Sequence, residues 1–115
     1  WGTGSPYREF LHADDLANAL FFLMQNYDGL EFVNCGSGVE ITIKDLALLV
    51  KEIVGYEGEI VHDTTKPDGT PRKLTDVSKI HDLGWKHTIS LRDGIESVYK
   101  EFSENYDAII NKYKA

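Results

Sequence analysis

Cysteine, proline and methionine are scarce in this sequence of 115 residues, which holds one cysteine, three prolines and one methionine. A single cysteine, Cys35, excludes a disulfide framework within the chain and a zinc cage built from several cysteines. Its place beside Gly36 favours a small buried apolar side chain over a reactive thiol.

Long apolar runs and an excess of positive charge are also lacking. No apolar run approaches the roughly 18 residues that a membrane-spanning helix needs. Twelve Lys and Arg stand against nineteen Asp and Glu, which gives a formal net charge of −7. The sequence therefore argues against a membrane or a nucleic acid as the main partner, although one local anion site is compatible with it. We expect a cytoplasmic protein.

What is present is an ordinary globular composition, 42% hydrophobic and 11% aromatic. A chain of 13.0 kDa scales to a folded surface of roughly 6,000–6,500 Å². We therefore expect one domain over residues 1–115 with a single core. The first residues, Trp1 to Pro6, are a turn-rich segment, and we expect the chain to be a piece of a longer protein.

The pattern of apolar residues predicts an α/β fold with three main helices and two or three short strands. The helices are expected over residues 14–27, 43–54 and 91–109, with a short one over 77–83 and a frayed tail from Asn111. Strands are expected over residues 8–12, 30–35 and 59–62. No two-residue hairpin turn joins neighbouring strands, so we expect parallel pairing through helical crossovers.

Three helix starts carry capping residues. Asp14 and Asp15 suit the first turn of the first helix, where they would cap free N–H groups and oppose the dipole. Thr42 with Asp45, and Ser90 with Asp93, have the spacing of capping boxes.

The sequence shows no catalytic or metal-binding set. Gly36-Ser37-Gly38 follows an expected strand, but Ile41 stands where a dinucleotide-binding fingerprint needs a third glycine. The four histidines lack the spacing of a zinc site. A nucleophile elbow of the Gly-x-Ser-x-Gly type does not occur.

Two segments could contact an anion. The loop from Lys66 to Lys73 carries three cations within eight residues, and two prolines and a glycine restrict its motion. Its Arg72 could engage two oxygens of a phosphate or diphosphate. A solvated turn held by Asp68 explains the same loop equally well. For Trp1 and Arg8, stacking on a base and pairing with a phosphate are possible roles, but a core aromatic and a surface charge are the favoured interpretation.

Longer motifs carry a resemblance to a known family. Residues 1–15 (WGTGSPYREFLHADD), residues 34–38 (NCGSG) and the loop of residues 66–76 (KPDGTPRKLTD) resemble the GDP-L-fucose synthases, which are extended short-chain dehydrogenases. LGW at residues 83–85 and SLRDGI at residues 90–95 extend the resemblance over nearly the whole chain.

The resemblance implies that residues 1–115 are a small C-terminal substrate-binding lobe. That family converts GDP-4-keto-6-deoxy-D-mannose to GDP-L-fucose by epimerisation at C3 and C5 and NADPH-dependent reduction at C4, as a homodimer. NADPH and the catalytic residues would belong to an N-terminal Rossmann lobe, so this chain alone would be inactive and would expose apolar surface. The implied substrate-binding residues are Trp1, Arg8, Asp68, Arg72 and Lys73.

Two other functions stay open. The chain could be the corresponding lobe of an epimerase or dehydratase that acts on a UDP- or dTDP-sugar. It could also be a free-standing interaction module that uses the loop of residues 66–73 as a docking turn.

Overall fold

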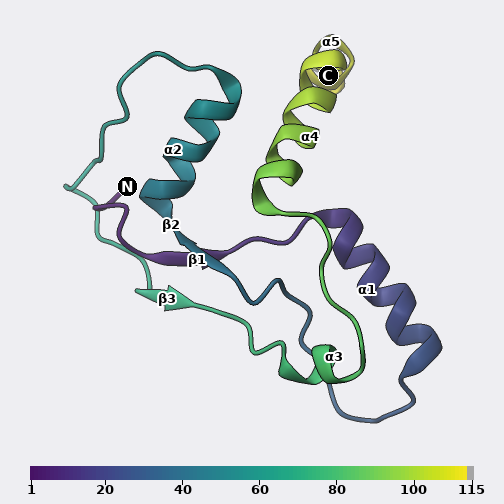
Figure 1. Ribbon diagram of the computed structural model, residues 1–115. Coiled ribbons are helices and arrows are strands. Elements are labelled where there is room, and N and C mark those ends of the chain that lie inside the picture. The colour runs from purple at the N-terminus through teal and green to yellow at the C-terminus, as the bar shows by residue number, and fades with distance from the viewer. Residues whose placement is uncertain (114–115) are drawn as a thin grey trace.

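The computed structural model describes residues 1–113 and has the predicted α/β fold (Figure 1). The helices in this range are α1 (Ala13–Asn26), α2 (Ile43–Val54), α3 (Ser78–Asp82), α4 (Leu91–Glu104) and α5 (Tyr106–Tyr113). The strands are β1 (Tyr7–Glu9), β2 (Glu40–Thr42) and β3 (Arg72–Lys73). In Figure 1 the sheet lies in the middle, α2 and α4 stand on one side of it, and α1 and α3 lie toward the far end of β1. None of the described helices is long and apolar enough to cross a bilayer.

The sheet is mixed, with the order β2-β1-β3. Strand β3 is parallel to β1, with Arg8 opposite Lys73, whereas β2 is antiparallel to β1, with Arg8 opposite Ile41. The prediction of parallel pairing is therefore wrong for β2. The reason is visible in Figure 1: after α1 the chain runs back past α3 and enters the sheet at the end where β1 leaves it.

Two of the predicted strands do not form in the described structure. Residues 30–35 and 59–62 lie in irregular chain, and Leu30 and Phe32 are almost fully exposed. A strand forms only where a neighbour accepts and donates its backbone hydrogen bonds, and neither segment has one within residues 1–113. The strands that do form outside β1 come instead from segments that the apolar pattern passed over.

Helix starts follow the local chemistry closely. Thr42 accepts a hydrogen bond from the Asp45 amide at 3.0 Å, and Ser90 accepts one from the Asp93 amide at 3.1 Å. Both predicted capping boxes are confirmed. Asp14 and Asp15 lie in the first turn of α1, as predicted. The cap itself is His12, whose Nδ1 accepts from the Asp14 amide at 3.2 Å, so the prediction that the two aspartates cap this helix is wrong.

The end of the chain forms two helices where one was predicted. Helix α4 ends at Glu104, and the next residue, Asn105, leaves the helical conformation at φ −112° and ψ 15°. Its side-chain amide donates to the Glu101 carbonyl at 2.9 Å, the kind of local bond that competes with helix continuation. Helix α5 then runs to Tyr113, so residues 111–113 are helical instead of frayed; residues 114–115 lie outside the described range.

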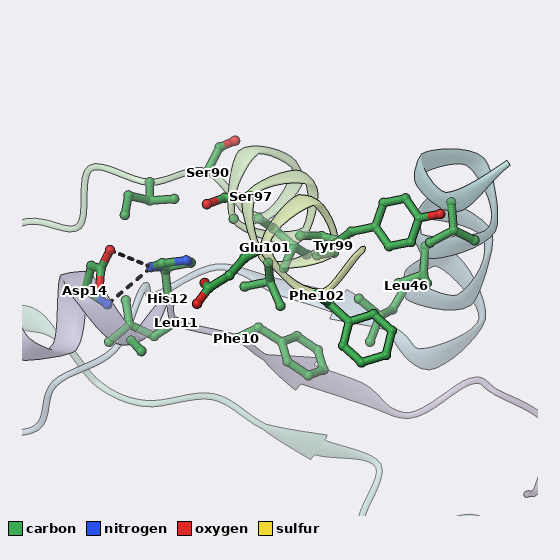
Figure 2. A pocket seen from close by; sticks show the side chains of 18 residues that line it. Phe10, Leu11, His12, Asp14, Leu46, Ser90, Ser97, Tyr99, Glu101 and Phe102 are labelled. Carbon is green, nitrogen blue, oxygen red and sulfur yellow. Dashed lines mark hydrogen bonds and ion pairs between the residues drawn. The ribbon is translucent and has the colours of Figure 1, made fainter. Parts of the chain in front are cut away.

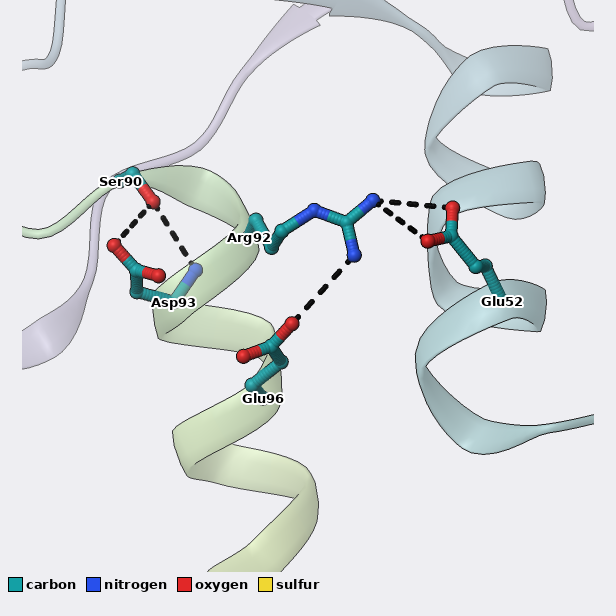
Figure 3. A network of polar contacts seen from close by, with 5 residues as sticks. All are labelled: Glu52, Ser90, Arg92, Asp93 and Glu96. Atoms are coloured by element: carbon teal, nitrogen blue, oxygen red, sulfur yellow. Dashed lines mark hydrogen bonds and ion pairs between the residues drawn. The ribbon is translucent and has the colours of Figure 1, made fainter.

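A clasp of exposed charges joins α4 to α2 (Figure 3). Arg92 Nη2 lies 3.0 Å from both carboxylate oxygens of Glu52, and its Nη1 lies 3.5 Å from Glu96 one turn along α4. Solvent screens such exposed pairs, so the clasp orients the two helices more than it stabilises them.

The core is much smaller than the composition suggests. The core cluster of the described residues consists of Ala19, Ile80 and Trp85, and the Trp85 indole donates to Asn18 at 2.8 Å. The accessible surface is 8529 Å², against the roughly 6,000–6,500 Å² expected for this mass. The radius of gyration is 17.2 Å, where about 13 Å is usual for a compact domain. The described residues thus form one core cluster, as expected, but it is small.

The buried carboxylate of Asp15 joins α1 to the segment of residues 88–89, which precedes α4. Asp15 is 3% exposed and accepts hydrogen bonds from the Thr88 amide at 3.0 Å, the Thr88 hydroxyl at 3.1 Å and the Ile89 amide at 2.9 Å. Burial by itself raises the pKa of Asp15, but the hydrogen bonds from Ile89 and Thr88 outweigh it, so the pKa lies below its ordinary value. Asp15 thus anchors α1 to the segment that leads into α4.

Replacing Asp15 with Asn should lower the free energy of unfolding by about 1–3 kcal/mol at pH 7, because the new amide group faces N–H donors. A depressed pKa stabilises the folded state above the pKa of the unfolded chain, about 3.9, and this contribution disappears as the pH falls through the folded-state value. Urea denaturation of both proteins at pH 7 and pH 3 should therefore show a large gap at pH 7 and a smaller one at pH 3. An equal gap at both values would contradict the assignment.

Candidate functional site

The N-terminal turn packs against the loop that leads into β3. The Gly2 amide donates to the Asp63 carbonyl at 2.8 Å, and the Thr3 amide and hydroxyl each donate to the Asp68 carboxylate at 2.8 Å. These bonds from Thr3 hold the pKa of Asp68 below its ordinary value. Asp68 therefore serves here as a tie between two segments, and its oxygens are already engaged within the chain.

Gly2 lies where this contact is closest. Its φ is +71°, and a Cβ at this position would sit 2.1 Å from Asp68 Oδ1. Only glycine combines this backbone conformation with so close an approach. The turn and the loop thus fit closely together at Gly2 and Asp68, which lie 66 positions apart in the sequence.

Trp1 lies at the open edge of this turn. It is 85% exposed, and the Lys66 ammonium lies 5.8 Å from the centre of its ring, a cation–π distance. The favoured interpretation of Trp1 as a core aromatic is therefore wrong. An exposed indole face beside a cation is suited to stacking on a planar ligand that carries negative charge.

Arg8 and Lys73 face the same way from neighbouring strands. They are register partners in the parallel pair of β1 and β3, and side chains of paired residues share a face of the sheet. Arg8 Nη1 donates to the Tyr7 carbonyl at 2.5 Å and the Thr70 carbonyl at 2.8 Å. Within residues 1–113 its other guanidinium nitrogens and the Lys73 ammonium form no hydrogen bond or ion pair.

The loop leaves room for this guanidinium. A Cβ on Gly69 would lie 2.9 Å from Arg8 Nη2, so a larger residue would press on the group. Two carbonyls fix Arg8 in place, and the free nitrogens can donate outward in the fork geometry that matches phosphate oxygens.

Arg72 lies on the opposite face of the sheet. It forms a two-pronged pair with Glu40 on β2, with its Nε 2.9 Å from Glu40 Oε2, and its guanidinium lies 5.3 Å from the centre of the Tyr7 ring. The bonds with Glu40 raise the pKa of Arg72. The structure thus separates Arg72 from Arg8 and Lys73, because alternate residues of a strand point to opposite faces.

The five predicted substrate-binding residues therefore divide by their contacts. Trp1, Arg8 and Lys73 present free groups outward, whereas Asp68 and Arg72 hold the surrounding chain together. No pattern in the sequence pointed to Glu40, because its pairing with Arg72 arises only when β2 and β3 flank β1. Lys66 was identified as a loop cation, but its contact with Trp1 depends on the fold.

A large cavity lies elsewhere, between α2 and α4 (Figure 2). It is an open groove of about 660 Å³ with a mostly apolar lining that includes Phe10, Leu46, Val50, Val98 and Phe102. Of the residues that the structure describes, no lysine or arginine lines it, so it does not suit a phosphate group. We therefore place the candidate anion site on the face of the sheet that carries Arg8 and Lys73, where the free positive charges lie, and not in the apolar groove.

The surroundings of Cys35 do not favour reactivity. Cys35 is half-buried against the core, and burial raises the pKa of its thiol, which fits an unreactive apolar side chain. Among the described residues no group of three or more His, Cys, Asp or Glu side chains could hold a metal ion.

Comparison with known proteins gives consistent matches. Residues 1–36 match the NAD dependent epimerase/dehydratase family. The chain is 62% identical over 105 residues to a protein named "Probable GDP-L-fucose synthase 1" of Oryza sativa subsp. japonica. The matched region covers 91% of this chain and 32% of that protein.

Solved structures agree with this match. A GDP-L-fucose synthetase from Naegleria fowleri bound to NADP superposes with a TM-score of 0.87 at 30% identity, over 92% of this chain and 34% of that one. A UDP-glucose 4-epimerase from Thermotoga maritima gives 0.80 at 30% identity, over 92% of this chain and 34% of that one.

The chain spans about a third of the length of the relatives it matches. The resemblance to GDP-L-fucose synthase is confirmed, and the extent of the match fits a C-terminal lobe.

Replacing Gly2 with Ala should break the tie to Asp68, because the added carbon displaces the carboxylate that Thr3 binds. Gly55 offers a matched control, since its φ is +67° but no atom lies within 4 Å of its Cβ position. Each substitution should cost about 1–2 kcal/mol of backbone strain. Only the change at Gly2 should also accelerate hydrogen exchange at the Thr3 amide; equal exchange in both variants would refute the tie.

Proposed function

We propose that the chain is the sugar-nucleotide-binding lobe of a GDP-L-fucose synthase, an enzyme that converts GDP-4-keto-6-deoxy-D-mannose to GDP-L-fucose by epimerisation at C3 and C5 and reduction at C4. The observation that carries the proposal is the pair of outward-facing cations, Arg8 and Lys73, on adjacent strands of a chain so similar to that family. A diphosphate is the part of the substrate that such a pair would bind.

Each predicted residue then has a role in the proposed site. Arg8 and Lys73 would neutralise the diphosphate, and Trp1 would stack against a planar or sugar part of the ligand. Asp68 would keep the loop closed against the N-terminal turn, and Arg72 would hold β3 to the rest of the sheet through Glu40. All five residues would thus serve binding, but only three of them by direct contact.

The lobe would contribute to catalysis by positioning the sugar of the substrate. Binding energy from the remote nucleotide can fix the sugar against the reacting groups, which makes the reaction effectively intramolecular. The chemistry itself would belong to an N-terminal lobe of the longer protein, which would also bind NADPH, and the whole enzyme would be a homodimer. In this sequence no tyrosine is followed by a lysine four positions later, as the family's catalytic pair requires.

The turn of residues 36–38 does not suit NADPH. A pyrophosphate needs free backbone N–H groups at such a turn, but the Gly38 amide and the Ser37 hydroxyl already donate to the Glu9 carboxylate, at 2.6 and 3.3 Å. A pyrophosphate bound at this turn would be repelled by the negative charge of the Glu9 carboxylate. This supports a cofactor site outside residues 1–113.

Exposed apolar side chains on α1 and the segment after it support a covering lobe. Phe21 and Met24 are 59% and 83% exposed, and Phe32 is 83% exposed. A free-standing domain seldom leaves so many large apolar groups in water. In the proposed enzyme the N-terminal lobe would cover them.

A UDP-sugar is the second candidate substrate, because the superposition on a UDP-glucose 4-epimerase is nearly as good as that on a GDP-L-fucose synthetase. The two cations of the proposed site would bind the diphosphate, which both candidate substrates carry, and an indole stacks on any base without reading its edge. The two candidates therefore share Arg8 and Lys73 and differ only in how the base is recognised.

Arg8→Ala and Lys73→Ala in the full-length enzyme should each raise KM for the GDP-sugar. Loss of one charged hydrogen bond costs about 1.5–3 kcal/mol, which corresponds to roughly a 10- to 150-fold change. Arg92→Ala removes the same charge from the clasp with Glu52 and should leave KM unchanged. If KM and kcat stay the same in both site variants, the assignment fails.

Titration of the full-length protein with GDP, UDP and ADP, followed by amide NMR shifts, should distinguish the substrate classes. We expect localised shifts at Arg8 and residues 66–73 with all three diphosphates, and the tightest binding with GDP. Tighter binding of UDP would favour the second candidate. No shift at these residues with any nucleotide would contradict the site.

A further inference from the structure

Glu9 joins three segments beneath the proposed anion site. Its Oε1 accepts hydrogen bonds from the Gly38 amide at 2.6 Å and the Ser37 hydroxyl at 3.3 Å, and its Oε2 accepts one from the Thr75 amide at 2.9 Å. These donors lie 28, 29 and 66 residues away in the sequence. One carboxylate therefore fixes β1, the turn of residues 36–38 and the chain just after β3.

The surroundings are built closely around this carboxylate. A Cβ on Gly36 would lie 2.5 Å from Glu9 Oε1 and 3.1 Å from the Thr75 side chain, so the turn approaches as only glycine allows. Glu9 is half-buried and Ser37 is buried. Burial by itself raises the pKa of Glu9, but the bonds from Thr75, Gly38 and Ser37 together hold it below its ordinary value, so the group is charged at neutral pH.

Strand β3 depends on the hydrogen bond from Thr75 to Glu9 because few backbone hydrogen bonds hold this short strand in the sheet. It consists of two residues, Arg72 and Lys73, and its pairing with β1 ends at Lys73. The bond from Thr75 to Glu9 lies two residues further along and holds the chain against β1 at that end. At the other end the Tyr7 amide donates to the Pro71 carbonyl at 2.9 Å.

Glu9 itself does not face the proposed ligand. It follows Arg8 in the strand and so points to the opposite face, the same face as Glu40, its register partner on β2. Its negative charge is therefore directed away from a diphosphate bound between Arg8 and Lys73. Any effect of Glu9 on binding must act through the position of the strands.

We propose that Glu9 is a positioning residue of the anion site, which sets the spacing of Arg8 and Lys73 by holding Thr75 beside β1. The inference rests on the proposed function, because it concerns the same two cations. It assigns to Glu9 a role that the resemblance to the family did not indicate.

Glu9→Gln tests this role because it removes one acceptor and keeps the shape. The Gln carbonyl can satisfy the two donors at Ser37 and Gly38, and its NH₂ group then faces the Thr75 amide, donor against donor. The variant should therefore release the end of β3 and leave the turn of residues 36–38 in place.

Asp15→Asn is the matched control. Asp15 also accepts two backbone amides and one hydroxyl, but it anchors α1 to the segment before α4 and touches neither β1 nor β3. Both variants should lose stability, so stability alone does not separate a structural from a positioning role.

The measurements are KM and kcat for the GDP-sugar in the full-length enzyme, with hydrogen exchange at the Thr75 and Gly38 amides. We expect Glu9→Gln to raise KM at least fivefold, with the change in KM larger than the change in kcat, and to accelerate exchange at Thr75 and not at Gly38. Asp15→Asn should leave KM within twofold of the wild type. The inference is overturned if Glu9→Gln accelerates exchange at Thr75 and KM does not change, or if both variants raise KM alike.

A measurement on the wild type serves if Glu9→Gln does not fold. Saturation with GDP should slow exchange at the Thr75 amide, because a ligand that bridges Arg8 and Lys73 holds β3 against β1. Unchanged exchange at Thr75 when GDP is bound would overturn the inference. Absence of GDP binding by the wild type would instead overturn the proposed function, so the two failures can be told apart.

Discussion

The pairing of β1 with strands on both of its sides is the interaction on which the rest of the site depends. Strand β1 has three residues, and each does a different task. Tyr7 lies beneath the Arg72 guanidinium, Arg8 presents its charge on the other face, and Glu9 ties down the turn of residues 36–38 and Thr75. Because alternate side chains point to opposite faces, one short strand keeps the binding cation apart from the groups that hold the sheet together.

That separation explains how an acidic chain can offer a site for an anion. The net charge is −7, yet three carboxylates around the proposed site are engaged: Glu40 with Arg72, Asp68 with Thr3, and Glu9 with three donors. Their charge is balanced by hydrogen bonds or directed away from the face of Arg8 and Lys73. Net charge thus describes the whole surface, and the local field at one pair of strands can have the opposite sign.

The small core makes the fold depend on polar contacts. Helices α2 and α4 meet through a charged clasp with an apolar groove beside it, and α1 exposes large apolar side chains. The burial that would normally stabilise a domain of this length is therefore incomplete within residues 1–113. The hydrogen bonds of Asp15 and Glu9 are therefore important for the tertiary structure, because each carboxylate joins segments that share little apolar packing.

The sequence by itself determined the features that rest on contacts between near neighbours. Thr42 and Ser90 cap helices because their hydroxyls reach an amide three residues ahead, and the loop motif of residues 66–76 identified the family resemblance. Only the tertiary structure decided which strands form, that β2 runs antiparallel, that Arg72 turns to Glu40, and that Glu9 reaches Thr75. These features join residues far apart in the chain, and a backbone hydrogen bond or a charge pair forms only when both partners are brought together. Residues 30–35 illustrate the limit, because a strand-like composition without a neighbouring strand remains an irregular chain.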